Sequence, residues 1–407
     1  MKKTVLREYA KLIALKGVNI QKGQEVVIRA GLDQPEFVEM LVKECYKAGA
    51  SDVTVEWGYQ PLTALNIRYK KQKDLNKIKD WELERMKYRA ETLPCTIFLT
   101  SEDPDGLKGV NQEKMMKARQ AQYPVLRPIR RSMENKYQWC IAGVPGKAWA
   151  KKVFPGERTS VAIEKLWEAI LHTSRAEVDP IAAWNEHNAD LKKRYDHLNS
   201  LGIKKLKYSA SNGTDFTVGM IDDGIFTGGG ETTLGGIFFN PNIPSEEIFT
   251  SPMKGEADGI VYATKPLSYN GELIENFSVR FEKGKAVEVK AEKGQALLEK
   301  MISMDEGASY LGEVALVPWN SPINETGILF YNTLYDENAC CHLALGQGFN
   351  ECLKGFEELT PDECTARGIN DSMIHVDFMI GSPDLVIDAY TKDGETVRLF
   401  DKGTWAF

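Results

Sequence analysis

The 407-residue sequence has few histidines, no CxxC motif and no long apolar segment. It contains no run of about 18 apolar residues, so no membrane-spanning helix is expected. No cluster of lysine and arginine offsets the formal net charge of −7, which argues against nucleic acid or an anionic membrane as a partner. Seven cysteines without CxxC spacing favour reduced thiols in a cytoplasmic protein over a disulfide framework.

The first residues begin like a signal peptide, but Arg7, Glu8 and Lys11 interrupt the apolar region that such a peptide requires. We therefore expect no export and a cytoplasmic location. The apolar fraction of 43% and the charged fraction of 27% are those of an ordinary globular protein. The length exceeds what one small core accommodates, and a change in pattern near residue 200 predicts two domains, 1–200 and 201–407.

The N-terminal half alternates strand and helix patterns. A strand over 25–30, a helix over 34–48 and a strand over 53–57 form a βαβ unit. Pro35 suits the first turn of that helix, and Gly49 suits its C-terminal cap. Such a crossover joins parallel strands, so the pattern predicts a mostly parallel sheet in an α/β domain. Further strands are predicted at 96–100 and 138–144, and further helices at 160–172 and 181–201.

From Lys204 onward, short β-rich segments alternate with turn residues. The turns that predict hairpins are Asn212-Gly213, Asn270-Gly271, Lys283-Gly284-Lys285 and Asp393-Gly394. A β-rich C-terminal domain follows, which makes the whole chain a combination of α/β and α+β. The glycines at 228–230, 235 and 236 satisfy neither GxGxxG nor the P-loop pattern, so they predict turns rather than a phosphate site.

His375 and Asp377 are two residues apart in the apolar run 374–380. In a β-strand, alternate side chains point to opposite faces, so this pair lies side by side on one face. An imidazole beside a carboxylate on a rigid strand suits a divalent metal ion. A polar strand face that meets solvent is the alternative, and the pair alone does not decide between the two.

Two further regions place an acid or a histidine in apolar surroundings. Glu313 is the one carboxylate in the strand pattern 311–317, so it reaches an edge or binds a positive group. His342 follows the residues 336–338, which indicate the capped start of a helix. Glu337 and His342 would lie about 140° apart around that helix. They therefore share a metal ion only if Glu337 lies at an irregular helix entrance.

Glu246 and Glu247 match the acidic first turn of a helix as well as a metal site. Carboxylates at four positions balance the charge of two divalent ions, and two histidines complete the ligand set. Such a pair of ions can polarise a carbonyl group and generate hydroxide at neutral pH. The other histidines lie in a charged helical stretch, where a solvated or hydrogen-bonded surface position is expected for His172, His187 and His197.

With these positions assembled, the chain resembles the aminopeptidase T / aminopeptidase S (PepS) family of dinuclear metalloaminopeptidases. Four motifs in order carry the resemblance: Asn242-Ile243-Pro244-Ser245-Glu246-Glu247, Leu311-Gly312-Glu313-Val314-Ala315-Leu316-Val317, Asp336-Glu337-Asn338-Ala339 leading to His342-Leu343-Ala344-Leu345-Gly346, and His375-Val376-Asp377-Phe378-Met379-Ile380-Gly381. The stretches 22–28 and 47–50 are also similar, so the resemblance covers nearly the whole length.

The resemblance implies an enzyme that removes the N-terminal residue from peptides by means of water activated between two divalent metal ions. Zinc, cobalt and manganese all suit a carboxylate-rich site with two histidines. The residues at the family's metal-binding positions are Glu247, Glu313, Glu337, His342, His375 and Asp377. Glu313 is the expected bridge between the ions.

The resemblance also implies a three-layer α/β N-terminal domain and a C-terminal catalytic domain that carries both metals. It implies a homodimer whose internal chamber admits short or unfolded peptides with a free N-terminus. Phe349 departs from the family pattern, because some relatives carry a tyrosine there and phenylalanine cannot donate a hydrogen bond. The general base and the side-chain preference are not assigned from the sequence.

Two alternatives remain open at this point. Another dinuclear hydrolase, such as a phosphoesterase, uses similar carboxylate and histidine clusters, although no arginine or lysine stands beside these motifs to bind phosphate. The second alternative is a non-catalytic peptide-binding protein with structural metals. Structural zinc favours cysteine-rich sites, whereas Cys340 and Cys341 are adjacent and lack a second pair.

Overall fold

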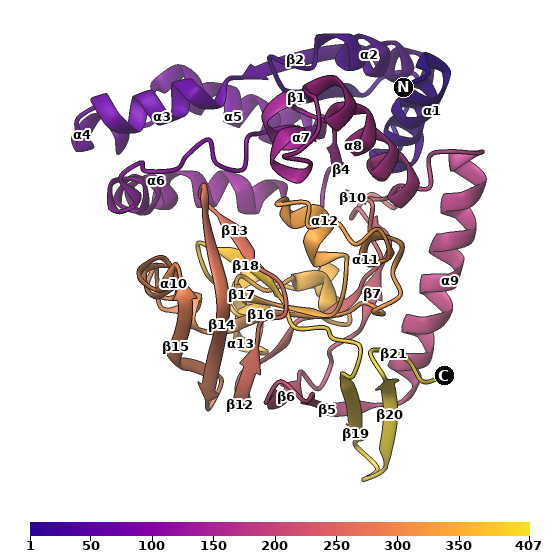
Figure 1. Cartoon of the computed structure of the whole chain (residues 1–407), viewed down its shortest axis with the longest axis vertical. Helices are drawn as coiled ribbons and strands as arrows, with labels where there is room; N and C mark the ends of the chain where they lie inside the picture. The colour runs from indigo at the N-terminus through magenta and orange to yellow at the C-terminus, as the bar shows by residue number, and fades with distance from the viewer. The chain divides into compact units, whose positions relative to one another are not determined.

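The computed structural model describes all residues from 1 to 407 and groups them into two compact units (Figure 1). Unit 1 comprises Met1–Asn188, Gly230–Ser245 and Asn270–Glu272, and unit 2 comprises Ala189–Gly229, Glu246–Tyr269 and Leu273–Phe407. None of the helices has the length and apolar character needed to cross a membrane. Whether 1–200 and 201–407 behave as two domains stays a prediction.

Unit 1 is built on a five-stranded parallel sheet with the strand order β10-β4-β3-β1-β2. The strands are β1 (Glu25–Gly31), β2 (Asp52–Gly58), β3 (Cys95–Thr100), β4 (Trp139–Gly143) and β10 (Asn242–Ile243). A two-stranded ribbon joins β8 (Glu231–Thr232) and β9 (Phe238–Phe239). The predicted parallel sheet is therefore confirmed.

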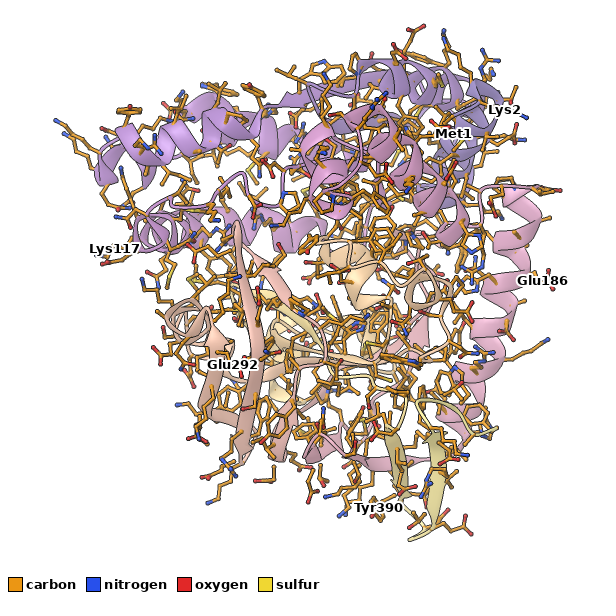
Figure 2. The ribbon with its side chains drawn as sticks, viewed as in Figure 1. Met1, Lys2, Lys117, Glu186, Glu292 and Tyr390 are labelled. Carbon is orange, nitrogen blue, oxygen red and sulfur yellow. The ribbon has the colours of Figure 1, made fainter.

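Most of the helices belong to unit 1. They are α1 (Lys3–Leu12) with a π-helical turn (Ile13–Gly17), α2 (Pro35–Ala48), α3 (Gln60–Tyr69), α4 (Gln72–Leu75), α5 (Asp80–Thr92), α6 (Gln112–Met133), α7 (Lys147–Val153) and α8 (Thr159–Thr173). The long helix α9 (Pro180–Ser200) continues from unit 1 into unit 2. Exposed charged side chains such as Lys117 on α6 and Glu186 on α9 point away from the ribbon (Figure 2).

Burial in the parallel sheet shows that both of its faces are covered. Val27 and Ile28 are neighbours in β1 and point to opposite faces, yet both are buried. Helix α2 contributes the stripe of Phe37, Leu41 and Cys45 to this core. It begins with a proline in its first turn and ends at Gly49, whose φ of 111° is left-handed, as the sequence predicted.

Unit 2 is dominated by antiparallel sheets. A five-stranded sheet has the order β18-β17-β16-β11-β7. Its strands are β7 (Thr227–Gly228), β11 (Ile248–Thr250), β16 (Leu311–Leu316), β17 (His342–Gly346) and β18 (His375–Met379). The predicted strands around Glu313 and around His375 are confirmed.

The second sheet of unit 2 has nine strands, with β15 pairing beside β14. The strands are β5 (Ile203–Ser209), β6 (Asp215–Met220), β12 (Pro252–Tyr262), β13 (Leu267–Tyr269), β14 (Glu272–Glu282), β15 (Lys285–Lys293), β19 (Val386–Thr391), β20 (Thr396–Asp401) and β21 (Thr404–Trp405). The predicted turns at Asn212-Gly213, Gly284 and Asp393-Gly394 join neighbouring antiparallel strands.

Short helices connect the strands of unit 2. They are α10 (Gln295–Ile302), α11 (Pro322–Glu325), α12 (Thr333–Glu337) and α13 (Pro361–Ala366), with single helical turns at Gly307–Ser309, Asn350–Cys352 and Phe356–Glu358. Helix α12 packs against β18. This contact positions the last residue of α12 beside the five-stranded sheet.

Candidate metal centre

The register of the five-stranded sheet brings four of the predicted ligands onto one face. Ala344 of β17 pairs with Glu313 of β16 on one side and with Asp377 of β18 on the other. Paired residues of an antiparallel sheet point to the same face, so both carboxylates flank the small alanine side chain. His342 lies two residues before Ala344, and His375 lies two residues before Asp377. Both histidines therefore point to the same face of the sheet as Glu313 and Asp377.

The remaining two predicted ligands approach from outside this row. Glu247 lies directly before β11, the strand that pairs with β16. Glu337 is the last residue of α12, and its carboxyl group makes a hydrogen bond with Asp377. Segments that lie more than a hundred residues apart in the sequence therefore converge. We call the six residues Glu247, Glu313, Glu337, His342, His375 and Asp377 the metal centre.

Two groups of side-chain ligand atoms meet at Glu313. The ligand atoms of Glu247, Glu313 and His342 all lie within 4.8 Å of one another, and those of Glu313, His375 and Asp377 do the same. Nε2 of His375 lies 3.1 Å from Oε2 of Glu313 and 3.3 Å from Oδ1 of Asp377. The two groups are thus adjacent and share one carboxylate.

Backbone carbonyl groups orient both imidazoles of the metal centre. Nδ1 of His375 lies 2.7 Å from the carbonyl oxygen of Gln347, and Nδ1 of His342 lies 3.3 Å from that of Cys340. A carbonyl oxygen can only accept, so each Nδ1 carries the proton and donates it. Each Nε2 is then left to face the carboxylates, in the arrangement that metal-binding histidines generally have.

The carboxylates of the metal centre are buried and mutually repulsive. Burial raises the pKa of Glu313 to about 7, although His375 opposes this shift. Burial also raises the pKa of Glu337 well above its ordinary value, and the charge of Asp377 adds to the shift. Asp377 differs: burial raises its pKa, but His375 outweighs burial and lowers it to about 2. Without a cation, burial therefore disfavours the ionised forms of Glu313 and Glu337.

The imidazoles respond in the opposite direction. Burial disfavours the charged form of His342, but the carboxylate of Glu247 outweighs burial and raises the pKa of His342 to about 9. His375 shows the same balance: burial opposes its charged form, and Asp377 and Glu313 together raise its pKa. Both shifts indicate a site that attracts positive charge.

One buried nitrogen atom of the site is well suited to bind a metal ion. Nε2 of His342 is buried and forms no hydrogen bond of good geometry, although Oε2 of Glu247 lies 3.2 Å away. A buried polar atom without a hydrogen bond is costly unless another partner, such as a metal ion, uses its lone pair. Four carboxylates beside two imidazoles also match the oxygen and nitrogen ligands that divalent ions prefer. The residues present fit divalent metal ions.

Cysteine takes no part in this arrangement. All seven cysteines are free and buried, and neither group of ligand atoms includes one. Burial raises the pKa of the Cys340 thiol to about 11, so the thiol is neutral at pH 7 and is a poor metal ligand. The cysteine-rich type of structural zinc site is therefore absent from this cluster.

Three local predictions from the sequence are wrong. His342 does not follow a helix start: α12 ends at Glu337, and His342 begins the buried strand β17. Glu246 and Glu247 lie in a loop, not in the first turn of a helix. His187 is buried rather than at the surface, and its Nε2 lies 2.7 Å from the carbonyl oxygen of Ser245.

The corrections share a physical cause. A short apolar run such as 339–346 has no periodicity that separates a buried strand from a buried helix. The pairing of β17 with β16 and β18 decides in favour of the strand. The helical-phase argument that separated Glu337 from His342 then no longer applies, because the two residues lie on different elements.

Two residues that hold the ligands in place were not predicted from the sequence. Asn338 was assigned only to a helix cap, yet its buried side chain bonds to both Glu246 and Glu337. Gln347 was not considered, although its carbonyl group orients His375. The one available signal was their position directly beside a candidate ligand or motif.

Phe349 lies beside the more accessible part of the metal centre. Its ring centroid is 4.9 Å from that of His375 and 5.3 Å from that of Phe249. The side chain of His375 is 27% exposed, whereas the other five residues of the centre are buried. The two phenylalanine rings therefore form an apolar wall next to the exposed imidazole.

The chain matches the thermophilic metalloprotease (M29) family over residues 2–405. The chain belongs to this family. Aminopeptidase AmpS of Bacillus subtilis (strain 168) is 41% identical over 99% of this chain and 98% of that protein. Aminopeptidase 2 of Geobacillus stearothermophilus shows the same identity and coverage. The solved structure of wild-type AmpT from Thermus thermophilus superposes with a TM-score of 0.90 at 37% identity, covering 100% of both chains.

These M29 relatives confirm several predictions made from the sequence. The family resemblance, the combined α/β and α+β fold and the enzyme class, a metalloaminopeptidase, are confirmed. Use of a divalent metal follows from membership of a metalloprotease family. The M29 match does not favour a phosphoesterase or a non-catalytic binding protein.

Proposed function

We propose that this M29 enzyme holds two divalent ions and removes the N-terminal residue from peptides that have a free amino terminus. One observation carries the proposal: two groups of ligand atoms share the carboxylate of Glu313. A carboxylate has two oxygen atoms, so Glu313 can face one ion with each. Its relatives carry the name aminopeptidase, which supports the substrate class.

Each ion has its own ligands in this proposal. Glu247 and His342 would hold one ion, His375 and Asp377 would hold the other, and Glu313 would contribute to both sites. The sixth ligand, Glu337, is tied to Asp377 by a hydrogen bond. When bound, the ions supply Lewis-acid polarisation of the scissile carbonyl group and lower the pKa of water.

The chain's own residues prepare the site for this chemistry. The carbonyl groups of Gln347 and Cys340 hold the imidazoles in the tautomer that directs Nε2 inward. Burial of the carboxylates excludes water from their far side and strengthens their attraction for cations. His375 is the partly exposed ligand, so we propose that the peptide enters past its ring and the wall of Phe249 and Phe349.

Four finer statements belong to the same proposal. The ions are zinc, cobalt or manganese, since oxygen and imidazole ligands suit all three. The enzyme is a homodimer, as the resemblance to aminopeptidases T and S implies. It works in the cytoplasm, which the seven free cysteines support. The catalytic centre lies within a C-terminal domain, 201–407.

Hydrolysis of leucine p-nitroanilide and of its N-acetylated form tests the activity. We expect cleavage of the free amine alone, loss of cleavage after dialysis against a chelator, and recovery when zinc, cobalt or manganese is added. Cleavage of both compounds would contradict an aminopeptidase. Hydrolysis of bis(p-nitrophenyl) phosphate in place of the anilide would support a phosphoesterase.

The number of ions is tested separately. Plasma mass spectrometry of the reconstituted protein should give two ions per chain. Glu313→Gln removes the shared charge and should lower the metal content, while Glu306→Gln, a change outside the metal centre, should not. A stoichiometry of one ion in the active unmodified protein would contradict the two-ion proposal. Light scattering of the same sample tests the homodimer.

A further inference from the structure

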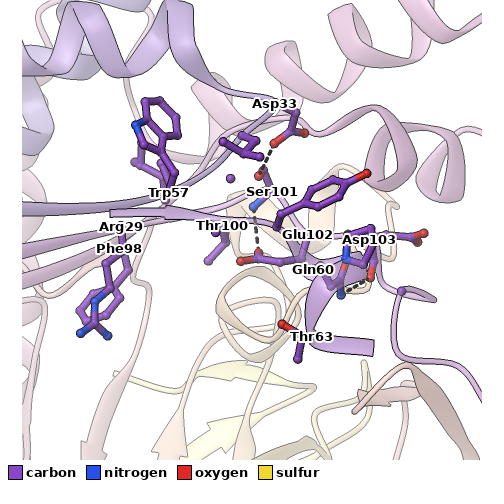
Figure 3. A pocket seen from close by; sticks show the side chains of 18 of the residues that line it. Arg29, Asp33, Trp57, Gln60, Thr63, Phe98, Thr100, Ser101, Glu102 and Asp103 are labelled. Carbon is purple, nitrogen blue, oxygen red and sulfur yellow. Dashed lines mark hydrogen bonds between the residues drawn. The ribbon is translucent and has the colours of Figure 1, made fainter. Parts of the chain in front are cut away.

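A large crevice lies in unit 1, at the carboxyl ends of the parallel strands. Its volume is about 990 Å³, and its walls come from the ends of β1, β2 and β3 and the segments that follow them (Figure 3). All of its lining residues belong to unit 1, and none of them is one of the six residues of the metal centre. A cavity of this volume holds a small molecule or the end of a peptide.

The strand order explains why the crevice lies at this place. The chain goes from β1 to β2 on one side of the sheet and then from β3 to β4 on the other. β1 and β3 are neighbours in the sheet, and the connections that follow them therefore run in opposite directions. Such a reversal leaves an opening between the two connections, and open parallel sheets bind their ligands there. We call this opening the switch-point crevice.

Tight packing holds the base of the switch-point crevice. The hydroxyl group of Ser101 donates a hydrogen bond to Oδ1 of Asp33 at 3.1 Å, which links the ends of β3 and β1 (Figure 3). The backbone N–H of Ser101 donates to Oε2 of Glu102 at 2.9 Å. Gly146 approaches so closely that an added Cβ would lie 2.0 Å from the carbonyl oxygen of Ser101. Ser101 therefore ties the exposed carboxylates of Asp33 and Glu102 to the ends of the strands.

The charges of the crevice are unevenly distributed. Arg29 and Arg85 both contact Glu56, at 3.1 Å and 2.7 Å. Arg89 contacts the same carboxylate at 2.6 Å, so this end of the crevice carries an excess of positive charge. At the strand ends, the lining residues include three carboxylates and one ammonium group. These lining residues are Asp33, Glu102, Asp103 and Lys147. The excess of negative charge at the strand ends repels anions such as phosphate and attracts a cation.

An apolar surface adjoins these carboxylates. Trp57, Tyr59 and Leu32 line the crevice and are 44%, 53% and 56% exposed. Large side chains with this exposure are available for contact with a ligand. Aromatic faces also attract organic cations through their ring electrons. The crevice thus combines acidic groups with an aromatic wall.

We propose that the switch-point crevice binds a primary ammonium group that carries an apolar side chain. Asp33 and Glu102 would accept hydrogen bonds from the ammonium group, and Trp57, Tyr59 and Leu32 would contact the side chain. Two sources have this chemistry in the proposed function: the amino end of a peptide substrate and the amino acid that the reaction releases. The binding step itself does not depend on hydrolysis.

Isothermal titration of the full-length protein with 2-phenylethylamine tests the proposal. The protein is first dialysed against a chelator, so that no metal ion binds the amine. We expect saturable binding of the amine and no binding of 3-phenylpropionate, which has the same ring with the opposite charge. Equal binding of the two compounds would overturn the proposal.

The double variant Asp33→Asn, Glu102→Gln locates the binding. Both changes keep an oxygen acceptor for Ser101, so the base of the crevice should stay folded. We expect at least a tenfold loss of affinity for the amine and unchanged circular dichroism. Glu39→Gln, an exposed change on α2, is the matched control and should bind as the unmodified chain does. Undiminished binding by the double variant would refute the assignment.

Comparison of leucine with the peptide amide Leu-Gly-Gly-NH₂ separates the two sources, again on the chelated protein. Tighter binding of the peptide identifies the substrate end, and tighter binding of leucine identifies the product. Binding of neither would overturn the proposal. These titrations need no catalysis, so their failure is distinguishable from a failure of the proposed hydrolytic function.

Discussion

The buried side chain of Asn338 accepts a hydrogen bond from the backbone N–H of Glu246 at 2.7 Å. Its amide nitrogen donates to the carbonyl group of Leu334 at 3.0 Å and to the carboxylate of Glu337 at 3.3 Å. One side chain thus joins the loop before β11 to helix α12. Each of these segments carries a proposed metal ligand, so Asn338 fixes their separation.

Replacing Asn338 should weaken metal binding. Asn338→Ala leaves the N–H of Glu246 without its partner and removes the donor to Glu337. Loss of such an orienting partner reduces metal affinity by about 10- to 100-fold, and an unpaired buried N–H costs about 1–3 kcal/mol of stability. Titration with zinc or cobalt and thermal unfolding of the metal-free protein measure the two effects. Asn66→Ala, an exposed change on α3, is the control. Reduced stability with unchanged metal affinity would show that Asn338 has only a structural role.

Gly228 should be essential for the position of Glu247. An added Cβ at Gly228 would lie 2.3 Å from the carbonyl oxygen of Glu247, which is backbone and cannot move aside easily. Gly228→Ala should therefore cost about 1–3 kcal/mol of stability, as overpacking generally does, and should lower metal affinity. Gly235→Ala is the matched control, since its nearest neighbour is 3.6 Å away. Equal unfolding temperatures of the two variants would contradict this prediction.

His375→Ala should abolish hydrolysis of leucine p-nitroanilide while the protein stays folded. The change removes a proposed metal ligand. Mutation of even a hydrogen-bond partner of a metal ligand generally lowers metal affinity or activity by about 10- to 100-fold. We therefore expect activity to fall by more than about 100-fold, with the far-ultraviolet circular dichroism unchanged. His172→Ala alters an exposed imidazole and should keep full activity. Full activity of His375→Ala would refute the site assignment.

Metal affinity should increase with pH between 7 and 9. The carboxylate of Glu247, against the effect of burial, raises the pKa of His342 to about 9, so the metal-free protein holds this imidazole protonated at pH 7. A metal ion binds the neutral imidazole and must displace that proton. Affinity therefore falls as pH decreases below 9. Titration in buffers of different ionisation enthalpy measures the released protons. Binding without proton release at pH 7 would contradict the prediction.

The local pattern of the sequence determined several elements by itself. Alternation along 375–379 predicted a strand with His375 and Asp377 on one face, and β18 has this arrangement. The apolar stripe, the proline and the terminal glycine predicted α2, because helix periodicity and caps are local properties. The glycine turns predicted hairpins for the same reason. Each of these features depends on residues that lie close together in the chain.

Only the tertiary structure decided how the metal centre is assembled. The strand β17 around His342 has no local signal that distinguishes it from a helix, and its pairing with β16 and β18 settles the question. Glu247 joins Glu313 through the pairing of β11 with β16, and Glu337 reaches Asp377 because α12 packs against β18. The switch-point crevice likewise exists because of the strand order. These relationships join residues that are distant in the chain, and such contacts form only when the sheets pair and the core packs.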